Sequence, residues 1–413
     1  MPRNTPPPAA VDDHAGPPTV TGRGTLLGAI FLMATSSIGP GFITQTTNFT
    51  VQLGAAFAFA ILVSILVDIA IQTNVWRVIG ISGMRAQELG NASLPGLGYV
   101  MAFLLLIGGL VFNIGNVSGA GLGMNIMTDI NVKLGAVLLA ALAVGIFLSK
   151  RAGVAMDRIV VLLGALMILL TLYIALTSGP PVGSALKNAV LPEQISALAI
   201  TTLIGGTIGG YIIYAGVHRL LDAGVTGERH LRELTRGAVT GIIVTGVMRI
   251  ILFLAILGVV SGGVELDPQS QAASAFEAAA GAVGYRLFGV VFAAAALTSV
   301  IGVSYTTITF LTSRRTSPRT TNLLVVGFIA LSTVLFLLIG AAPAQLLVFA
   351  GAFNGILLPV GIGVMLWVAW RRRDLLHGYR YPTWLAGIGT VAWLVTLYLA
   401  FNSIRPAIEL VTG

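Results

Sequence analysis

The sequence predicts an all-α polytopic membrane protein in which two helices are interrupted at membrane depth. Hydrophobic residues make up 56% of the 413 positions and charged residues 9%, with a mean hydropathy of +0.94, whereas soluble domains carry about 25% charged residues. The interruptions are a polar stretch at residues 36–55 and a glycine-rich stretch at residues 204–216, each inside an apolar segment. Unwound backbone at membrane depth is tolerated only against protein or a water-filled cavity, so the pair predicts a transporter's binding site.

Eleven apolar segments follow a polar tail, and most are near the ~20 residues that cross the hydrocarbon core. Residues 1–24 are rich in proline, which predicts a disordered cytoplasmic tail. The predicted spans cover residues 25–53 (interrupted), 56–80, 97–128, 133–149, 155–178, 196–219 (interrupted), 237–260, 285–311, 320–340, 343–370 and 384–403. They form one predicted transmembrane domain, residues 25–403, before a short extracytoplasmic tail at residues 404–413.

Basic residues indicate how the chain is oriented. Of its 23 Lys and Arg residues, only Lys133, Lys187, Arg286 and Arg405 fall in loops on the side opposite the N-terminal tail. The positive-inside rule then places the N-terminus in the cytoplasm. The protein itself is expected in the inner (plasma) membrane. The net charge of +8 is thus a sign of topology and not of nucleic-acid binding. Because the chain has no cysteine, disulfides and thiolate metal sites are excluded.

Two charged residues are predicted at depth, Asp68 in the second span and Arg249 in the seventh. Each is costly in lipid and must face the bundle interior, a cavity or a partner. One interpretation is ion or proton coupling. The other is a structural ion pair or a side chain that reaches the interface, and the sequence leaves both open.

Four strings carry a resemblance to a known family: GPGF at residues 39–42, GNVSGAGLGMN at 115–125, GGTIGGYIIYAG at 205–216 and AFNGILLP at 352–359. Together with the two interrupted segments, they resemble the NRAMP superfamily, the transporters related to the natural resistance-associated macrophage protein. The resemblance implies a LeuT-like fold with a 5+5 inverted repeat and discontinuous helices 1 and 6. The repeats are expected at about residues 25–178 and 196–370, with an extra helix at residues 384–403.

The sequence departs from this family at the positions that hold metal. Metal-transporting members carry Asp-Pro-Gly-Asn in the first helix, whereas TQTTNFT follows here without an acid. The positions that match the family's Met-Pro-His, its acidic pair and its tenth-helix glutamine hold Gly209, Gly210 and Tyr211, then Asn113 and Asn116, and then Gly351 with Asn354 nearby. The resemblance therefore implies a divergent branch without the transition-metal site.

The predicted substrate site is neutral. A dehydrated divalent cation needs several oxygen ligands, usually with carboxylates among them, and soft metals need Met, Cys or His. The four histidines, His14, His218, His230 and His377, are predicted to be solvated in the tail or in cytoplasmic loops. The predicted substrate-binding residues are Gln45, Thr46, Thr47, Asn48, Gly209, Gly210, Tyr211, Tyr214, Asn113, Asn116 and Asn354. A structural role is the alternative to substrate binding at these positions: the glycines would be helix-packing contacts, and the asparagines would donate hydrogen bonds between helices.

These residues favour a secondary transporter of a small polar organic solute, such as a carboxylate. A cyclic amide such as 5-oxoproline is implied only by the resemblance, because members that lack the metal motif resemble proteins found with enzymes of cyclic-amide metabolism. No Walker motif is present, so coupling is expected to H⁺ or Na⁺. The candidates are Asp68 for a proton, and the hydroxyls of Ser304, Thr306 and Thr307 for sodium, although such hydroxyls also bond back to their own helix.

Two further hypotheses remain open. One is a divalent-cation transporter for Mg²⁺ or Mn²⁺ on the same fold, and the other is a non-transporting membrane receptor. An enzyme is not expected, because no Ser/His/Asp or metal constellation is discernible. The expected partners are a small-molecule substrate and the lipid bilayer, with no cofactor, nucleic acid or obligate protein partner.

Overall fold

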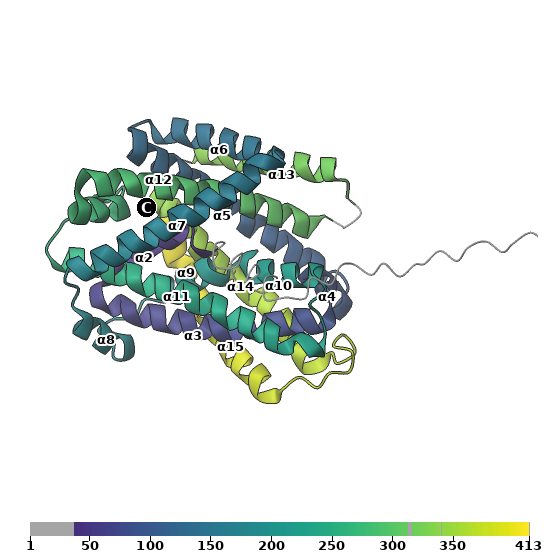
Figure 1. Cartoon of the computed structure of the whole chain (residues 1–413). Coiled ribbons are helices and arrows are strands. Elements are labelled where there is room, and N and C mark those ends of the chain that lie inside the picture. The colour runs from purple at the N-terminus through teal and green to yellow at the C-terminus, as the bar shows by residue number, and fades with distance from the viewer. Residues whose placement is uncertain (1–36, 313–315, 340, 413) are drawn as a thin grey trace, which may run out of the picture.

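The computed structural model describes residues 37–312, 316–339 and 341–412, with the side chains of residues 150–161 and 411–412 left out. All regular structure in this part of the chain is helical (Figure 1). The predicted disordered tail, residues 1–24, and the first half of the interrupted first span lie outside the described residues.

The helices lie close to where the apolar segments were predicted. They are α2 (Pro40–Leu53), η1 (Gly54–Ala56), α3 (Phe57–Ser82), α4 (Ala86–Ser93), α5 (Leu97–Thr128), α6 (Val132–Leu148), α7 (Lys150–Thr177), α8 (Val182–Val190), α9 (Ala197–Ile208), α10 (Ile212–Asp222), η2 (Glu228–His230), α11 (Leu231–Ser261), α12 (Gln271–Leu311), α13 (Pro318–Leu338), α14 (Pro343–Arg371) and α15 (Thr383–Thr412). Each of the eleven predicted apolar segments overlaps at least one of them.

Eight stretches in the described part of the chain are long and apolar enough to cross a membrane, or nine if the bent pair α7 and α8 is one span. The sequence predicted eleven spans, and the number in the structure is smaller for two reasons. The helix α6 has only 17 residues, and α2 and α3 follow one another so closely, across η1, that they count together. Two predicted ends also move. The helix α12 starts earlier than expected and kinks at Gly281, and α15 runs to Thr412, so residues 404–412 form a helix instead of a tail.

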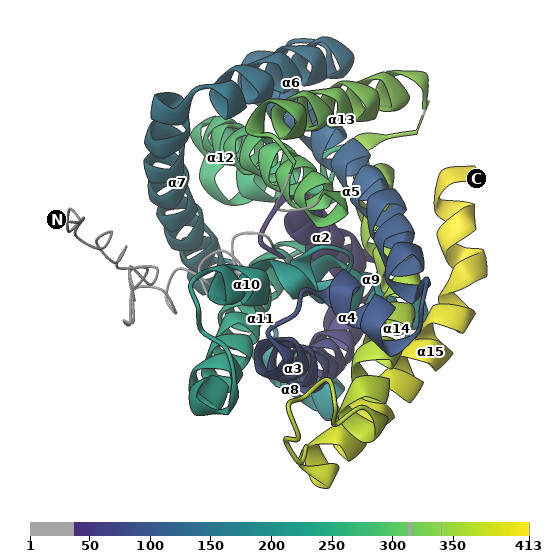
Figure 2. The ribbon, with the colours of Figure 1, turned by 90° about the vertical axis from the view of Figure 1, so that its right-hand side faces the viewer.

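The two interrupted helices lie in the middle of the bundle. Figures 1 and 2 show α2, α9 and α10 surrounded by the other helices, with α6 and α13 at one side and α3 at the other. The fully buried Trp76 of α3 anchors α10, because its indole N–H donates to the Ile213 carbonyl at 3.0 Å. The core therefore holds the second half of the broken sixth segment in place.

The second break is confirmed inside the predicted stretch. Helix α9 ends at Ile208 and α10 begins at Ile212. Between them Gly210 has φ +57°, in the left-handed region that a residue with a Cβ rarely adopts. Glycine at this position thus permits the chain to leave one helix and start the next.

The first break is shorter than the sequence suggests. Ile38 and Gly39 are not helical, and α2 starts directly at Pro40. The expectation that the polar string at residues 44–50 exposes backbone is wrong, because this string is helical. Its threonine hydroxyls donate to carbonyls four residues earlier, as from Thr50 to Thr46 at 2.6 Å, and so they satisfy themselves within the helix.

Candidate functional site

The second break meets α14 at Asn354. This amide is 1% exposed, and its Nδ2 donates to the carbonyls of Gly108 at 3.0 Å and Ala350 at 2.9 Å. Its Oδ1 has no partner and lies against Gly210, so close that a Cβ on Gly210 would collide with it. The glycine in the break therefore makes room for an acceptor atom with an unfilled hydrogen bond.

A small cavity opens beside this contact. Its volume is about 40 Å³, and it is lined by Gly210, Tyr214 and Asn354 together with apolar residues of α5 and α14. A site needs at least roughly 10–15 Å³ of this kind of volume to hold one water. The cavity thus has room for a few waters but not for an organic solute in this conformation.

Gln45 of α2 lies at the centre of the bundle, between α9 and α14. It is fully buried, and its Nε2 donates to the Leu347 carbonyl at 3.0 Å while its Oε1 has no partner. A Cβ on Gly206 or on Gly351 would collide with this amide. Gln45 thus packs against Gly351, which lies one turn before Asn354 on α14. We call Gln45 and Asn354 the amide pair.

The expectation of empty space at Gly209 and Gly210 takes a different form in the structure. The space next to Gly210 is filled by the Asn354 amide, and the space next to Gly209 by backbone of Gly205. Sequence reasoning did not single out Gly206, although it lies within the predicted break. The string GGTIGG at residues 205–210 contains two glycine pairs, and the prediction named only the second pair, Gly209 and Gly210. Gly206 belongs to the first pair.

The two tyrosines of the break pack differently. Tyr211 is 3% exposed and sets its ring edge to face Phe112 of α5, with centroids 6.2 Å apart. Tyr214 stacks on His218 at 5.9 Å and lies 5.6 Å from Phe310 of α12. The prediction that His218 is a solvated loop residue is therefore wrong, because one more helical turn of α10 carries it into an aromatic stack.

Asn113 on α5 behaves as an interhelical donor. Its Nδ2 donates to Ser304 Oγ of α12 at 3.1 Å and to Ser332 Oγ of α13 at 3.0 Å. Both hydroxyls also donate to carbonyls of their own helices. This arrangement matches the structural alternative, in which asparagine binds three helices together.

Asn116 differs, because neither atom of its amide has a partner although it is 1% exposed. Gly109 and Gly123 of α5 contact α12 at Thr307 and Ala293, and Asn116 is seven residues from each. Positions seven apart lie on nearly the same face of a helix, so Asn116 faces α12. The neighbouring Ser299 of α12 contacts Gly39 in the first break, which places Asn116 near that break.

The remaining polar residues of α2 do not join the amide pair. The hydroxyls of Thr46 and Thr47 donate to the carbonyls of Phe42 and Ile43, at 2.7 and 2.9 Å. Asn48 is only half-buried and accepts from Gln52 at 2.8 Å. Of the four predicted residues on this helix, only Gln45 therefore brings an open acceptor to the centre.

Asp68 and Arg249 do meet, through Thr207. Arg249 Nη1 donates to Thr207 Oγ1 at 3.0 Å, and Asp68 interacts with the same hydroxyl and by charge with Arg249. Both charged residues are at most 2% exposed. Thr207 lies two residues before Gly209, and its carbonyl accepts from Ser37 beside the first break at 2.9 Å. We call Asp68, Thr207 and Arg249 the charged cluster, and it contacts both breaks.

Arg249 has one occupied and one open edge. Besides Thr207, its Nη1 reaches the Leu203 carbonyl at 3.5 Å, and the face of the guanidinium lies 4.4 Å from the Phe42 ring centroid. Its Nε and Nη2 have no partner, and neither has Asp68 Oδ1. Nε and Nη2 together form the edge with which arginine binds a carboxylate through two parallel hydrogen bonds.

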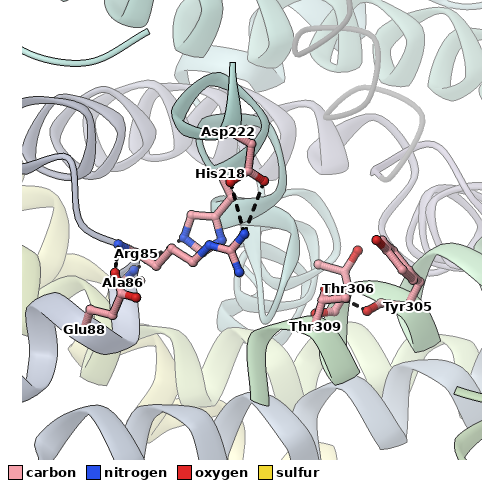
Figure 3. Close-up of polar contacts among 8 residues, drawn as sticks. All are labelled: Arg85, Ala86, Glu88, His218, Asp222, Tyr305, Thr306 and Thr309. Atoms are coloured by element: carbon pink, nitrogen blue, oxygen red, sulfur yellow. Dashed lines mark hydrogen bonds and ion pairs between the residues drawn. The ribbon is translucent and has the colours of Figure 1, made fainter. Parts of the chain in front are cut away.

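The predicted sodium ligands on α12 do not converge. Ser304 donates to the Val300 carbonyl at 2.6 Å, and Thr307 is buried against Gly109 without a partner. Thr306 is half-buried, and Figure 3 shows it beside Tyr305 and Thr309. The hydroxyl of Thr309 donates to the Thr306 carbonyl at 3.1 Å. The described residues also contain no group of three or more His, Asp or Glu residues that would hold a metal ion.

A polar contact joins the far end of α10 to the start of α4. Arg85 Nη2 pairs with both oxygens of Asp222, at 3.1 and 3.2 Å, and His218 Nε2 accepts from the Ala86 backbone N–H at 3.4 Å (Figure 3). We call the ion pair of Arg85 and Asp222 the latch, because it fastens the end of α10 to α4. His218, one turn earlier on α10, stacks on Tyr214, which lines the small cavity, so the latch lies close to that cavity.

Comparison with known proteins agrees with this architecture. Residues 30–405 match the family model described as natural resistance-associated macrophage protein-like (Nramp). The membrane protein YcsG of Bacillus subtilis (strain 168) is 50% identical over 373 residues, which cover 90% of this chain and 91% of YcsG.

Solved structures show the same fold at low sequence identity. The manganese transporter of Eremococcus coleocola superposes with a TM-score of 0.76 at 18% identity, covering 93% of this chain and 87% of that one. MhsT in complex with L-phenylalanine has a TM-score of 0.64 at 17% identity, covering 95% and 99%. With a LeuT-like fold and a family match over most of its length, the chain belongs to the Nramp family of membrane transporters.

Proposed function

We propose that this protein is a secondary transporter that carries a small polar organic solute across the plasma membrane by alternating access around the two breaks. The solute class we assign is a carboxylate or a cyclic amide, of which 5-oxoproline is an example. The N-terminus is cytoplasmic in this proposal. We assign no transition-metal site and no enzymatic step to the chain.

The observation that carries the proposal is the amide pair beside the second break. Gln45 Oε1 and Asn354 Oδ1 are buried acceptors without partners. Leaving such an atom unpaired costs about 1–3 kcal/mol. A solute with N–H or O–H groups removes this cost when it binds, whereas the closed conformation retains it.

The same atoms suit a divalent cation less well. Amide oxygens do coordinate such ions, but in this chain they come without the carboxylates that offset lost hydration at membrane depth. The nearest carboxylate group we identify, Asp68, already lies beside the positive charge of Arg249. A cation entering there would be repelled by this guanidinium.

The charged cluster supports an anionic solute and proton coupling. The open edge of Arg249 has the geometry for a carboxylate. A solute carboxylate next to Asp68 would bring two negative charges together, and a proton on Asp68 removes that repulsion. Binding of the proton and of the anion therefore favour one another, which is the thermodynamic basis of symport. That the same fold holds L-phenylalanine in MhsT is consistent with an organic carboxylate as cargo.

A ligand screen followed by uptake tests this proposal. Purified protein is screened by thermal shift against organic acids, cyclic amides and divalent salts, and the strongest ligand is then tested for uptake into proteoliposomes with and without an inward proton gradient. We expect an organic acid or cyclic amide to stabilise the protein and to accumulate when the gradient is present. Stabilisation by Mn²⁺ or Mg²⁺ alone, followed by uptake of that ion, would overturn the proposal.

A further inference from the structure

A long apolar groove lies on the surface between α14 and α15, next to the start of α5. Its volume is about 660 Å³. It is lined on α14 by Val360 and Trp367, on α15 by Trp393 and Phe401, and at one end by Ser93 and Leu94. Figure 2 shows α5, α14 and α15 side by side, with α15 at the margin of the molecule. The groove therefore opens outward, away from the centre of the bundle.

The groove is shaped by the absence of a side chain. A Cβ on Gly363 would approach the Trp393 ring to 3.3 Å, so glycine lets α15 come near while the neighbouring positions stay open. Several lining residues remain exposed in spite of their size, such as Trp367 at 55% and Phe401 at 78%. In a membrane, such surfaces are covered by acyl chains or by protein, because water is absent there.

A row of residues on α14 leads from the groove to a positive charge. Ile356, Val360, Val364 and Trp367 all line the groove, and Arg371 continues the row at the next turn. Arg371 lies 15 positions after Ile356, which corresponds to about 22 Å along the helix at 1.5 Å per residue. One leaflet of the hydrocarbon core is about 15 Å thick, so the apolar part of the row matches a leaflet and Arg371 reaches the headgroup level.

Arg371 is the available charge at this end. It is exposed and makes no ion pair within the described part of the chain. Its neighbour Arg372 is already engaged, because Nη1 donates to the Ser93 carbonyl at 2.8 Å and Nη2 to Asp374 at 2.7 Å. That hydrogen bond holds the pKa of the Asp374 carboxyl below its ordinary value.

We propose that this groove binds one anionic glycerophospholipid of the cytoplasmic leaflet. An acyl chain lies along the row on α14, and the phosphate pairs with Arg371. Charge favours an anionic over a zwitterionic lipid, because Arg371 adds a positive charge with no carboxylate partner at the headgroup level. Since Ile356 is two residues after Asn354, the bound lipid supports α14, the helix that carries Asn354 of the amide pair, whichever solute is transported.

Native mass spectrometry on the purified full-length protein tests this, with phosphatidylglycerol and phosphatidylcholine as probes. We expect retention of phosphatidylglycerol over phosphatidylcholine. One Lys or Arg at a membrane surface contributes about fivefold in lipid affinity, so Arg371→Gln should lower phosphatidylglycerol binding by about that factor and leave phosphatidylcholine unchanged. Arg319→Gln, which removes an exposed charge at the start of α13, is the matched control and should change neither.

A second variant separates the groove from the charge. Val360 is 41% exposed and lines the groove, so Val360→Trp adds volume there, and it should reduce retention of both lipids. Val391→Trp, at an exposed position of α15 outside the groove, should have no effect. Equal retention of the two lipids by the wild type, or no change in Arg371→Gln, would overturn the proposal. A dimer in solution that Val360→Trp dissociates would also overturn it, because a second copy would then occupy the groove.

Discussion

The amide pair, through Gln45, and the charged cluster, through Arg249, contact the same turn of α9 and differ in what they leave unpaired. Gln45 packs on Gly206 and Arg249 bonds to Thr207, the next residue, which faces about 100° around the helix. The amide pair is neutral and leaves two acceptor oxygens unpaired, whereas the charged cluster holds one carboxylate and one guanidinium. In the mechanism we propose, the amide pair recognises the polar solute and the charged cluster balances the charge.

The largest expected effect comes from breaking the charge balance. Arg249→Gln leaves the Asp68 carboxylate buried without its counter-charge, and removal of one partner from a buried pair costs about 3–5 kcal/mol. We therefore expect a clear loss of the free energy of unfolding in detergent. The double variant Asp68→Asn with Arg249→Gln should recover much of this loss. Strictly additive effects in the double variant would show that the two residues do not interact.

Next in size is the effect on coupling. Asp68→Asn keeps the shape of the side chain but can no longer take up a proton, so solute uptake should persist by exchange and lose its response to an imposed pH gradient. Asp129→Asn, an exposed residue at the end of α5, is the matched control and should remain gradient-driven. Unchanged proton dependence in Asp68→Asn would remove this cluster from the coupling mechanism.

A comparable effect is expected where glycine holds the amide pair in place. Gly351→Ala should cost about 1–3 kcal/mol of unfolding free energy, because its Cβ would collide with Gln45 in a packed core. Gly327→Ala on α13 meets open space and should be neutral or slightly stabilising. Chemical denaturation of the two variants side by side compares these costs. Equal stability of both would mean that Gln45 does not occupy this position.

The smallest effect on stability is expected at the latch. Arg85→Gln removes an ion pair whose Asp222 side chain is half exposed, worth about 0.2–1 kcal/mol. We expect stability to change little and the cavity to open more often toward the cytoplasm. Because the chain has no cysteine, a single Met101→Cys in the cavity lining reports this opening directly. Its rate of labelling by a polar thiol reagent should rise in the Arg85→Gln background, and an unchanged rate would contradict the role of the latch.

Much of the fold follows from the sequence, because hydropathy and basic loop residues act over whole helices. The second break was predicted from the glycine-rich string at residues 204–216, although Gly205 and Gly206 in the same string are helical and, of its glycines, only Gly209 and Gly210 lie between the helices. The first break was placed too far along the chain, because the threonines that look like unwound backbone in a sequence satisfy their hydroxyls within α2. Residue types predict hydrogen-bonding capacity, but only coordinates show which atoms are already paired.

The same limit explains the site. Asn113, Asn116 and Asn354 are alike in sequence, yet their contacts differ. The Nδ2 of Asn113 bridges to two other helices while its Oδ1 stays unpaired, Asn354 donates to two carbonyls and also keeps its Oδ1 open, and Asn116 is wholly unpaired. Thr207 was missed because its role depends on its position between α3 and α11, which sequence spacing does not report. The meeting of Asp68 and Arg249 required the same knowledge.

Isothermal titration calorimetry of the purified protein with Mn²⁺, and separately with the strongest organic ligand from the screen, tests the central claim most directly. The account predicts saturable binding of the organic solute that weakens by about two- to twelvefold in Asn354→Leu, through loss of one hydrogen bond of about 0.5–1.5 kcal/mol, and no saturable binding of Mn²⁺. Saturable Mn²⁺ binding that disappears in Asn354→Leu or Gln45→Leu would contradict it.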